Sequence, residues 1–519
     1  MGLNLKISLI HLDVHYKAPD HNRSNLIELN RKAAEKSQLL VNTEMAVSGY
    51  SFQSMEDIDG YVESATGPTL TLLKEIARTY GTYICIGFAE EDERTGIYYN
   101  AAHVIGPEGK TVCRYRKINA EARWACPGAG TQDNTFDTPW GRIGVLICSD
   151  TYHGLLPRQT ALRGAKMILV PANWPASGID PQNIWKARAM ENGVYVVACN
   201  RSGRDRTMSC DNAWSCAFTP GGKKIVARCS SGSSIVSFQV TLKHGQLPGQ
   251  DNRKKLETRK PELYRPIYLD MRHSDYGGSD FTSYYEMPRP GKFSVTSFAG
   301  ESQQSNISES LLNEMGKKQG RPGFHCFLLP RIFDRQSLSI FSSQPALKKL
   351  PEHIAVFVGY KENNGETGTL LILFQGERHW YQNTHHEKSN ISNNNQSFPA
   401  IVDMGPLRVG VCCENELVHP ETAVACSKLG CDLLLVSAGS LDNSAPLVFG
   451  VKSVEQTAIA VAGKNMAFIC EPPQGHQPWR EKKILKQGVC RMTLHSKRTR
   501  KKRFQDRVDF DLLLTTKKV

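Results

Sequence analysis

One ordered pattern of strands and helices occurs twice along the chain, and this repeat limits the possible folds more than any other feature. The clearest pair of segments is GRIGVLICSDTYHGLLPRQTALRGAKMILVPANW at 141–174 and LRVGVCCENELVHPETAVACSKLGCDLLLVSAGS at 407–440. Each segment reads as a buried strand, a helix and a second buried strand. The flanking segments repeat in the same order, so we predict two copies of one domain.

Strands and helices alternate within the first copy. The segment LKISLIHLDV at 5–14 is strand-like, and SNLIELNRKAAEKSQ at 24–38 has apolar residues at helical spacing. The segment TLTLLKEIARTYG at 69–81 is predicted to be a helix that Gly81 ends. A hairpin is predicted to turn at 107–109. This alternation predicts an α/β fold for each copy.

The length of the chain agrees with two domains. A chain of 519 residues exceeds what one hydrophobic core supports, and 40% hydrophobic with 22% charged residues is typical of globular proteins. The two copies meet near 276–290, so we place the first domain at residues 1–280 and the second at 288–519. No run of about 18 apolar residues occurs, so we expect no membrane partner.

The cysteines indicate a reducing compartment. Their number, 15, is odd, they are scattered along the chain, and no C-x-x-C pair occurs. This pattern argues against a zinc site and against a disulfide framework. The first residues alternate like a strand rather than forming a signal peptide. We therefore expect a cytoplasmic protein with no metal and no cofactor.

The net charge of +13 is spread along the chain, with its densest part in SKRTRKKR at 496–503. This segment, above all 497–503, is either a phosphate-binding element or a solvated loop. The charge alone does not decide between the two. We expect no nucleic-acid partner.

Three polar residues stand at the ends of apolar strands in the first copy. Glu44 closes LLVNTE, Lys117 closes TVCRYRK, and Cys148 closes GVLIC. Strand ends of an α/β fold converge on one rim, so these side chains are predicted to meet. Glu44 would take the thiol proton, and Lys117 would lower the pKa of the thiol and hold the oxyanion. The alternatives are a cysteine that only packs and a lysine that only faces solvent.

These residues and their contexts resemble the nitrilase (carbon–nitrogen hydrolase) superfamily. The resemblance lies within roughly 6–270 and rests on NTEMAVSGY, YRKINAE, GRIGVLICSD, ARAMENGVYVVACNRSG and RKPELY. It implies a four-layer αββα sandwich that cleaves non-peptide C–N bonds without a metal. It assigns Glu44 as general base, Lys117 as oxyanion-stabilising cation and Cys148 as nucleophile. Glu121 resembles the second glutamate of the family, which orients the lysine or the substrate amine.

The residues after the cysteine favour one branch of the superfamily. Nitrile-cleaving members tend to carry Trp-Glu there, whereas this chain has Ser149 and Asp150. We therefore predict an amidase or carbamoylase that forms a thioester with a small amide or N-carbamoyl compound and releases ammonia or an amine. The alternatives are nitrile hydrolysis by the same triad and a catalytically silent binding or scaffold protein. The expected substrate-binding residues are Ser149, Tyr152, Asn173 and Trp174.

The second copy lacks the triad when the two copies are aligned. Opposite Glu44, Lys117 and Cys148 stand, in that order, Arg331, Asn383 or Thr384, and Glu414. We therefore expect a degenerate copy without hydrolytic activity. It would serve as an internal partner of the first copy in a pseudo-dimer, with a regulatory role as the alternative and further homo-oligomers open.

Overall fold

The computed structural model describes residues 4–249, 255–269, 285–300, 304–318, 320–361, 368–382, 400–475 and 477–516. The chain forms two compact units. Unit 1 is Met1–Glu257 together with Arg507–Leu513, and unit 2 is mainly Thr258–Asp506. The boundary that the sequence places between 280 and 288 stays a prediction, because 270–284 lie outside the described residues.

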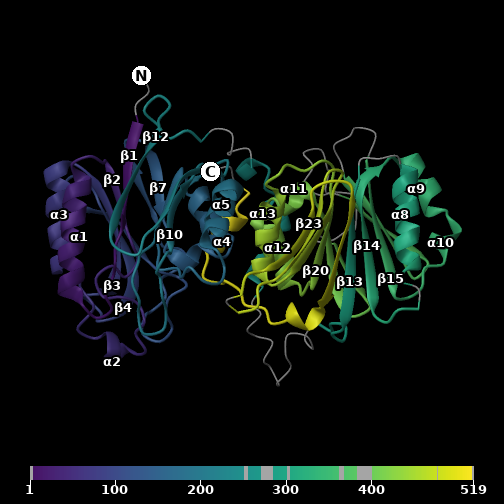
Figure 1. Ribbon diagram of the computed structural model, residues 1–519, viewed down its shortest axis with the longest axis horizontal. Helices are drawn as coiled ribbons and strands as arrows, with labels where there is room; N and C mark the ends of the chain where they lie inside the picture. The colour runs from purple at the N-terminus through teal and green to yellow at the C-terminus, as the bar shows by residue number, and fades with distance from the viewer. Residues whose placement is uncertain are drawn as a thin grey trace. The chain divides into compact units, whose positions relative to one another are not determined.

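Unit 1 contains two six-stranded sheets (Figure 1). The first has the order β12-β1-β2-β3-β4-β5 and the second β11-β10-β9-β8-β7-β6. The strands of the first sheet are β1 (Asn4–His11), β2 (Leu39–Asn42), β3 (Tyr83–Glu91), β4 (Tyr98–Ile105), β5 (Thr111–Arg116) and β12 (Ser234–Thr241). Those of the second are β6 (Thr135–Thr138), β7 (Gly141–Val145), β8 (Met167–Pro171), β9 (Tyr195–Cys199), β10 (Trp214–Phe218) and β11 (Lys224–Cys229).

Helices cover the outer faces of both sheets. They are α1 (Pro19–Ala34) and α3 (Pro68–Tyr80) on the first sheet, and α4 (Leu155–Leu162) and α5 (Pro181–Asn192) on the second. The sheets pack on each other through β1, β2 and β3 against β8 and β9, which gives helix–sheet–sheet–helix layers. The predicted α/β class is therefore confirmed.

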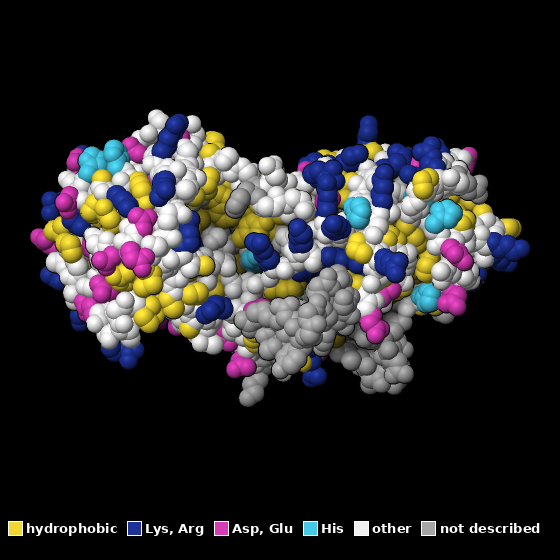
Figure 2. Space-filling model, turned by 90° about the horizontal axis from the view of Figure 1, so that it is seen from below, with side chains coloured by type: hydrophobic (Ala, Val, Ile, Leu, Met, Phe, Trp, Pro, Cys, Tyr) yellow, Lys and Arg dark blue, Asp and Glu magenta, His cyan; other side chains and the backbone are white. Residues whose placement is uncertain are grey.

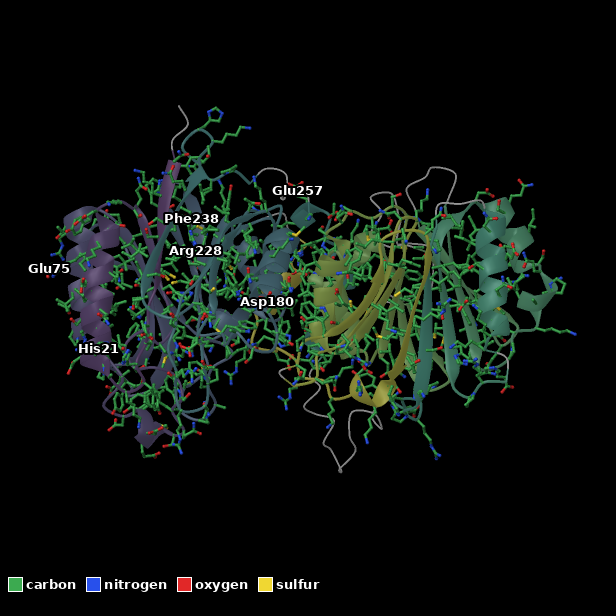
Figure 3. The ribbon with its side chains drawn as sticks, viewed as in Figure 1. His21, Glu75, Asp180, Arg228, Phe238 and Glu257 are labelled. Atoms are coloured by element: carbon green, nitrogen blue, oxygen red, sulfur yellow. The ribbon has the colours of Figure 1, made fainter. Side chains whose placement is uncertain are left out.

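The α3 helix shows how the sequence dictates these layers. Its residues Leu70, Leu73 and Ile76 follow helical spacing and are buried in the core between α1, α3 and the first sheet. Glu75, on the opposite face, is exposed (Figure 3). Gly81 ends the helix with φ +62°, as predicted, because glycine adopts this left-handed conformation without a Cβ penalty.

Unit 2 also contains two six-stranded sheets. Their orders are β24-β13-β14-β15-β16-β17 and β23-β22-β21-β20-β19-β18. The strands of the first are β13 (Lys292–Ala299), β14 (Phe324–Phe333), β15 (Ile354–Lys361), β16 (Gly368–Phe374), β17 (Glu377–Gln382) and β24 (Gly488–His495). Those of the second are β18 (Ala400–Met404), β19 (Leu407–Cys413), β20 (Leu433–Ser437), β21 (Ala458–Ala462), β22 (Ala467–Glu471) and β23 (Arg480–Ile484).

The helices of unit 2 also flank its sheets (Figure 1). On one side lie α8 (Gln304–Gly316) and α9 (Arg335–Ser342), and on the other α12 (Pro420–Lys428) and α13 (Ala445–Gly450). Shorter helical segments in the chain are α2 (Met55–Ile58), η1 (Cys148–Thr151), η2 (Pro261–Leu263), η3 (Arg265–Tyr268), α10 (Pro345–Lys348), α11 (Glu414–Leu417), η6 (Val451–Glu455), η7 (Ser496–Arg498) and α14 (Phe510–Leu514).

The two units share one strand order. Counted along the chain, the first strand of each unit pairs antiparallel with a late strand and parallel with the second strand, as β1 does with β12 and β2, and β13 with β24 and β14. The remaining neighbours match in the same way. Four sheets in this order are consistent with tandem copies. The pairing of the copies in a pseudo-dimer stays a prediction.

The basic segment 497–503 is partly turned inward. Arg500 is buried and donates to both carboxylate oxygens of Asp432, through Nε at 3.0 Å and Nη2 at 2.9 Å. Lys502 donates to the carbonyl oxygens of Cys431 and Gln456, and burial lowers its pKa to about 8. These two side chains therefore hold unit 2 together, whereas Lys497 remains exposed.

Many other Lys and Arg side chains lie on the surface of the chain, including that of unit 2 (Figure 2). Within the described ranges, no helix combines the length and the apolarity needed to cross a bilayer. The same residues contain no group of three or more His, Cys, Asp or Glu side chains arranged to hold a metal ion.

Candidate functional site

Glu44 lies in the turn that follows β2, and its side chain is fully buried. Thr43 donates from Oγ1 to the carbonyl oxygen of Ala172, at 2.6 Å, which ties this turn to the end of β8 in the other sheet. Gly87 of β3 packs against the turn so closely that a Cβ there would lie 2.7 Å from Glu44 Cα. The carboxylate is therefore fixed between the two sheets.

Lys117 follows the end of β5 and bridges two carboxylates. Its Nζ donates to Glu44 Oε1 at 2.7 Å and to Glu121 Oε1 at 2.5 Å. The lysine and both glutamates are buried. Tyr50 donates its hydroxyl proton to Glu121, and its ring centroid lies 5.4 Å from Lys117 Nζ, within the range of a cation–π contact. The structure thus brings the three predicted residues Glu44, Lys117 and Glu121 together.

Asn100 of β4 completes this network. Its Nδ2 donates to Glu44 Oε1 at 2.7 Å and to Glu121 Oε2 at 3.0 Å. Glu44 Oε2 is buried and has no hydrogen-bond partner among the described residues. One oxygen of the Glu44 carboxylate is therefore saturated, while the other is available to a reacting group.

Cys148 lies next to this carboxylate at the start of η1. The sequence predicts a strand up to the cysteine, but β7 ends at Val145, and Leu146 continues its pairing only through its N–H to the carbonyl of Leu169 at 3.0 Å. Cys148 has φ +45°, which non-glycine residues rarely adopt. Such backbone strain persists only where the surroundings enforce it, and it clusters at functional sites.

The pKa shifts indicate an ion pair between Lys117 and Glu121 and, beside it, Glu44 as a base next to the Cys148 thiol. Burial and the Glu44 carboxylate raise the pKa of Cys148, and Lys117 only partly opposes them. The expected lowering of this pKa by Lys117 is thus outweighed, and the thiol rests protonated. Burial also raises the pKa of Glu44, which makes it a stronger base, whereas Lys117 holds the pKa of Glu121 below its usual value.

Asp150 connects the loop after Cys148 with the loop after Lys117. Its carboxylate accepts from the Tyr115 hydroxyl at 2.7 Å and from the Asn119 N–H at 2.7 Å. Burial raises the pKa of Asp150 to about 6. The carbonyl oxygen of Ser149 accepts from the Asn119 amide at 3.1 Å, so Ser149 reaches this loop through its backbone.

The other three predicted substrate-binding residues are Asn173, Tyr152 and Trp174. The backbone N–H of Asn173 lowers the pKa of Cys148 by hydrogen bonding, while the Asn173 side chain turns to Arg201. The half-buried rings of Tyr152 and Trp174 have centroids 6.3 Å apart. Their aromatic pair lies on the loops that follow β7 and β8. Contact with substrate stays a prediction for all three.

Sequence reasoning missed Asn100 and Tyr50. The segment YYNAAHVI carries a signal for Asn100, because a polar residue in a buried strand needs hydrogen-bond partners. Tyr50 lies in a loop without regular structure; it closes the motif NTEMAVSGY, but a tyrosine there carries no local signal of a contact with Glu121.

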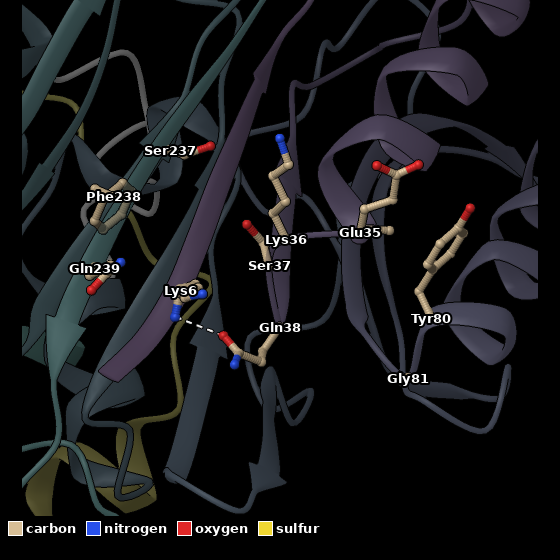
Figure 4. A pocket seen from close by; sticks show the side chains of 11 residues that line it. Lys6, Glu35, Lys36, Ser37, Gln38, Tyr80, Gly81, Ser237, Phe238 and Gln239 are labelled. Atoms are coloured by element: carbon tan, nitrogen blue, oxygen red, sulfur yellow. Dashed lines mark hydrogen bonds between the residues drawn. The ribbon is translucent and has the colours of Figure 1, made fainter. Parts of the chain in front are cut away.

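A surface hollow of about 590 Å³ lies elsewhere on unit 1 (Figure 4). Its wall includes Lys6, Gln38, Tyr80 and Phe238. Lys6 donates its N–H to Gln38 Oε1 at 2.8 Å across it. None of the residues predicted to carry chemistry lines it, so we assign it no role in the reaction.

Unit 2 carries an ion pair at the matching strand ends. Arg331 at the end of β14 donates to Glu414 at 2.5 Å and 3.1 Å. A Cβ on Gly359 of β15 would lie 3.1 Å from Arg331 Cα, as one on Gly87 would approach Glu44. The other expected counterparts, Asn383 and Thr384, lie outside the described residues.

Comparisons with known proteins show the family of the chain. The family model "Carbon-nitrogen hydrolase" matches residues 7–246. A nitrilase of Pyrococcus abyssi is 33% identical over 207 residues, which cover 39% of this chain and 77% of the relative. A probable nitrilase of Schizosaccharomyces pombe is 30% identical, with 44% and 85% covered. An omega-amidase of Xenopus laevis is 26% identical, with 46% and 89% covered. The chain therefore belongs to the carbon–nitrogen hydrolase family of the nitrilase superfamily and is a hydrolase acting on C–N bonds.

Proposed function

We propose that unit 1 hydrolyses a small amide or N-carbamoyl compound through a thioester on Cys148, with Glu44 as base and Lys117 as the cation of the oxyanion. The observation that carries this proposal is the free Oε2 of Glu44 beside the thiol, on a carboxylate whose other oxygen is held by Lys117 and Asn100. A buried carboxylate with one such oxygen fits a general base.

In the first half of the reaction, Cys148 Sγ forms a bond to the carbonyl carbon, and the thiol proton moves to Glu44. The carbonyl electron pair becomes an oxyanion beside Lys117 Nζ. The C–N bond then breaks, Glu44 returns the proton to the leaving nitrogen, and ammonia or an amine departs. A thioester remains.

In the second half, water gives a proton to Glu44 as its oxygen bonds to the thioester carbon. The second tetrahedral intermediate expels the Cys148 sulfur, which takes the proton back. The carboxylic or carbamic acid leaves, and the free thiol is restored. Two moderate steps thus replace one difficult displacement.

The branch of the superfamily is the finer part of the proposal. Ser149 and Asp150 after the nucleophile favour amide over nitrile hydrolysis, since nitrile-cleaving members tend to carry Trp-Glu there. Relatives named as nitrilases and as omega-amidases both resemble the chain, so nitrile hydrolysis by the same triad is the second candidate. Ammonia release from a panel of amides, carbamoyl amines and nitriles distinguishes the two.

The nucleophile can be tested directly in the full chain. We expect Cys148→Ala to lower turnover by roughly a thousandfold or more. Iodoacetamide should alkylate Cys148 faster than the exposed Cys229, because Glu44 takes up the thiol proton during attack. Glu44→Gln should remove this advantage. Ammonia release and mass-spectrometric mapping of the modified cysteines provide the measurements.

A matched control is Cys229→Ala, which should leave turnover unchanged because Cys229 is exposed on β11. Turnover that survives Cys148→Ala would refute the mechanism. Alkylation of Cys148 no faster than of Cys229 would favour the silent scaffold instead.

We also propose that unit 2 is a degenerate copy without hydrolytic activity. The shared strand order supports a common origin, and at the matching strand ends an Arg331–Glu414 ion pair stands in place of the base and the nucleophile. From the odd number of scattered cysteines we propose that the protein works in the cytoplasm. Pairing of the copies and any homo-oligomer stay predictions.

A further inference from the structure

Asn100 binds both carboxylates of the network through its side chain and Lys117 through its backbone. Its side-chain Nδ2 donates to Glu44 at 2.7 Å and to Glu121 at 3.0 Å, and its backbone carbonyl oxygen accepts the backbone N–H of Lys117 at 2.8 Å. The side chain is fully buried. Since both side-chain partners are carboxylates, only the Nδ2 donor end can face them.

The location of this amide fixes which oxygen of Glu44 is free. Lys117 and Asn100 both bind Oε1, so Oε2 has no hydrogen-bond partner among the described residues. Two buried carboxylates share a single cation here, and they repel each other. The amide lies between them as a neutral donor, which stabilises the charged form of each without adding a second cation.

The register of unit 2 supplies an internal comparison. Gly87 pairs with Ala102 across β3 and β4, and Gly359 pairs with Leu370 across β15 and β16. Asn100 lies two residues before Ala102, and Gly368 lies two residues before Leu370. Asn100 of unit 1 therefore matches Gly368 of unit 2. The amide is missing from the unit whose base and nucleophile are replaced by an ion pair.

A neighbouring hydrogen bond, from a tyrosine to a carboxylate, is present in both units. The Tyr115 hydroxyl donates to Asp150 at 2.7 Å in unit 1, and the Tyr381 hydroxyl donates to Glu416 at 2.8 Å in unit 2. Both tyrosines stand near the end of an edge strand, and the two carboxylates stand two residues after Cys148 and after Glu414. The fold retains the Tyr–carboxylate bond in both units, but it does not require an asparagine at the position of Asn100.

From this contrast we infer that Asn100 is a positioning residue for the reaction, which holds Glu44 and Glu121 together and leaves Glu44 Oε2 directed to the Cys148 thiol. The inference rests on the proposed function of the triad. The titratable groups that act on Glu44 are Lys117, Glu121, Tyr50, Cys148 and Cys210. Each of them remains in place when Asn100 is replaced.

The test measures the rate of Cys148 alkylation by iodoacetamide across a pH series, which needs no substrate. Asn100→Asp replaces the donor with a third carboxylate at constant size, and we expect the acid-side midpoint to rise by about one pH unit or more. Asn100→Ala and Asn100→Ser should raise it by less. The matched control is Asn134→Ala, since Asn134 is buried and also donates two hydrogen bonds, to Val145 and Thr160, but none to the network.

A midpoint that rises in the Asn100 variants and not in Asn134→Ala supports the inference. If the Asn100 variants lower the melting temperature but leave the midpoint unchanged, as Asn134→Ala should, the inference is overturned. Failure of all three Asn100 variants to fold, with Asn134→Ala folded, also overturns it, because Asn100 would then serve the fold. If Glu44→Gln leaves the wild-type profile unchanged, the proposed function itself has failed.

Discussion

At the scale of single residues, Asp150 is a fully buried carboxyl that links two loops of the site through hydrogen bonds. It accepts hydrogen bonds from Tyr115 and Asn119, which favour its charged form, yet burial dominates and raises its pKa from 3.8 to about 6. The unfolded chain therefore releases this proton at lower pH than the folded one. Between about pH 4 and pH 6, folding retains the proton.

The sign of the resulting pH dependence follows from this difference. Because the native state binds the extra proton, the free energy of unfolding falls as pH rises through this window, by about 3 kcal/mol from this group. We expect Asp150→Asn to lose this slope. Urea unfolding at pH 4 and pH 7 gives the free energy of unfolding of the wild type and of Asp150→Asn. The difference between the two proteins should change between the two pH values.

His11 provides the contrast within the same unit. It is buried between Ser215 and Ser202, and burial lowers its pKa to about 4. Its contribution to stability is therefore lost as pH falls from about 6.5 to 4, the opposite sign. Because wild type and Asp150→Asn share His11, its effect cancels in their difference. An unchanged difference between pH 4 and pH 7 would contradict the assignment to Asp150.

At the scale of elements, the packing of β3 against the turn after β2 fixes the position of the base. We expect Gly87→Ala to destabilise unit 1 by about 1–3 kcal/mol, because the new Cβ would lie 2.7 Å from Glu44 Cα and 2.9 Å from the Thr43 carbonyl oxygen. Backbone atoms have to shift to admit it. The alkylation rate of Cys148 should fall together with the melting temperature.

The control for this change is Gly232→Ala, since no atom lies within 4 Å of a Cβ there. It should alter neither the melting temperature nor the alkylation rate. If Gly87→Ala behaves like Gly232→Ala, the close approach does not constrain the base.

The same elements show how far sequence reasoning reaches. The end of α3 at Gly81 and the hairpin between β4 and β5 are local, because a glycine at φ +62° and a tight turn depend on adjacent residues only. The convergence of Glu44, Lys117 and Cys148 was also predictable, since polar residues at strand ends share a rim.

Other features of the site depend on contacts far apart in sequence. Asn100 joins Glu44 and Glu121 only through the register of β4, and strand pattern alone does not fix that register. The φ of +45° at Cys148 is imposed by its surroundings against its own preference. The pKa of the thiol required the depth of burial, which outweighs Lys117.

At the scale of the whole molecule, the two units share one strand order but have different charged groups at the matching strand ends. Arg331 and Glu414 are 14% and 21% exposed in their side chains, whereas the Glu44 and Lys117 side chains are fully buried. Arg331 and Glu414 hydrogen-bond to each other at the strand end. Neither side chain is a thiol nucleophile, so the pair stabilises the strand end.

We therefore expect Arg331→Ala and Glu414→Ala to leave C–N hydrolysis unchanged. Each should lower the stability of unit 2 by about 1–3 kcal/mol, because its partner loses a charged hydrogen bond. The double variant should be less destabilised than the sum of the two singles. Ammonia release and thermal unfolding of the full chain test this, and a tenfold loss of turnover in either single variant would contradict it.

The C-terminal segment Arg507–Leu513 has a consequence for how the protein is made. It belongs to unit 1, where Asp509 donates its N–H to Gln159 at 3.0 Å and pairs with Arg163 at 2.9 Å. The ribosome adds these residues only after it has translated all of Thr258–Asp506. Domains near the N-terminus usually finish folding during synthesis, but this one gains the contacts of Asp509 only after Thr258–Asp506 has been synthesised. A polypeptide that stops within unit 2 therefore lacks Asp509, and with it the contacts that this residue makes with Gln159 of α4 and with Arg163 just after it.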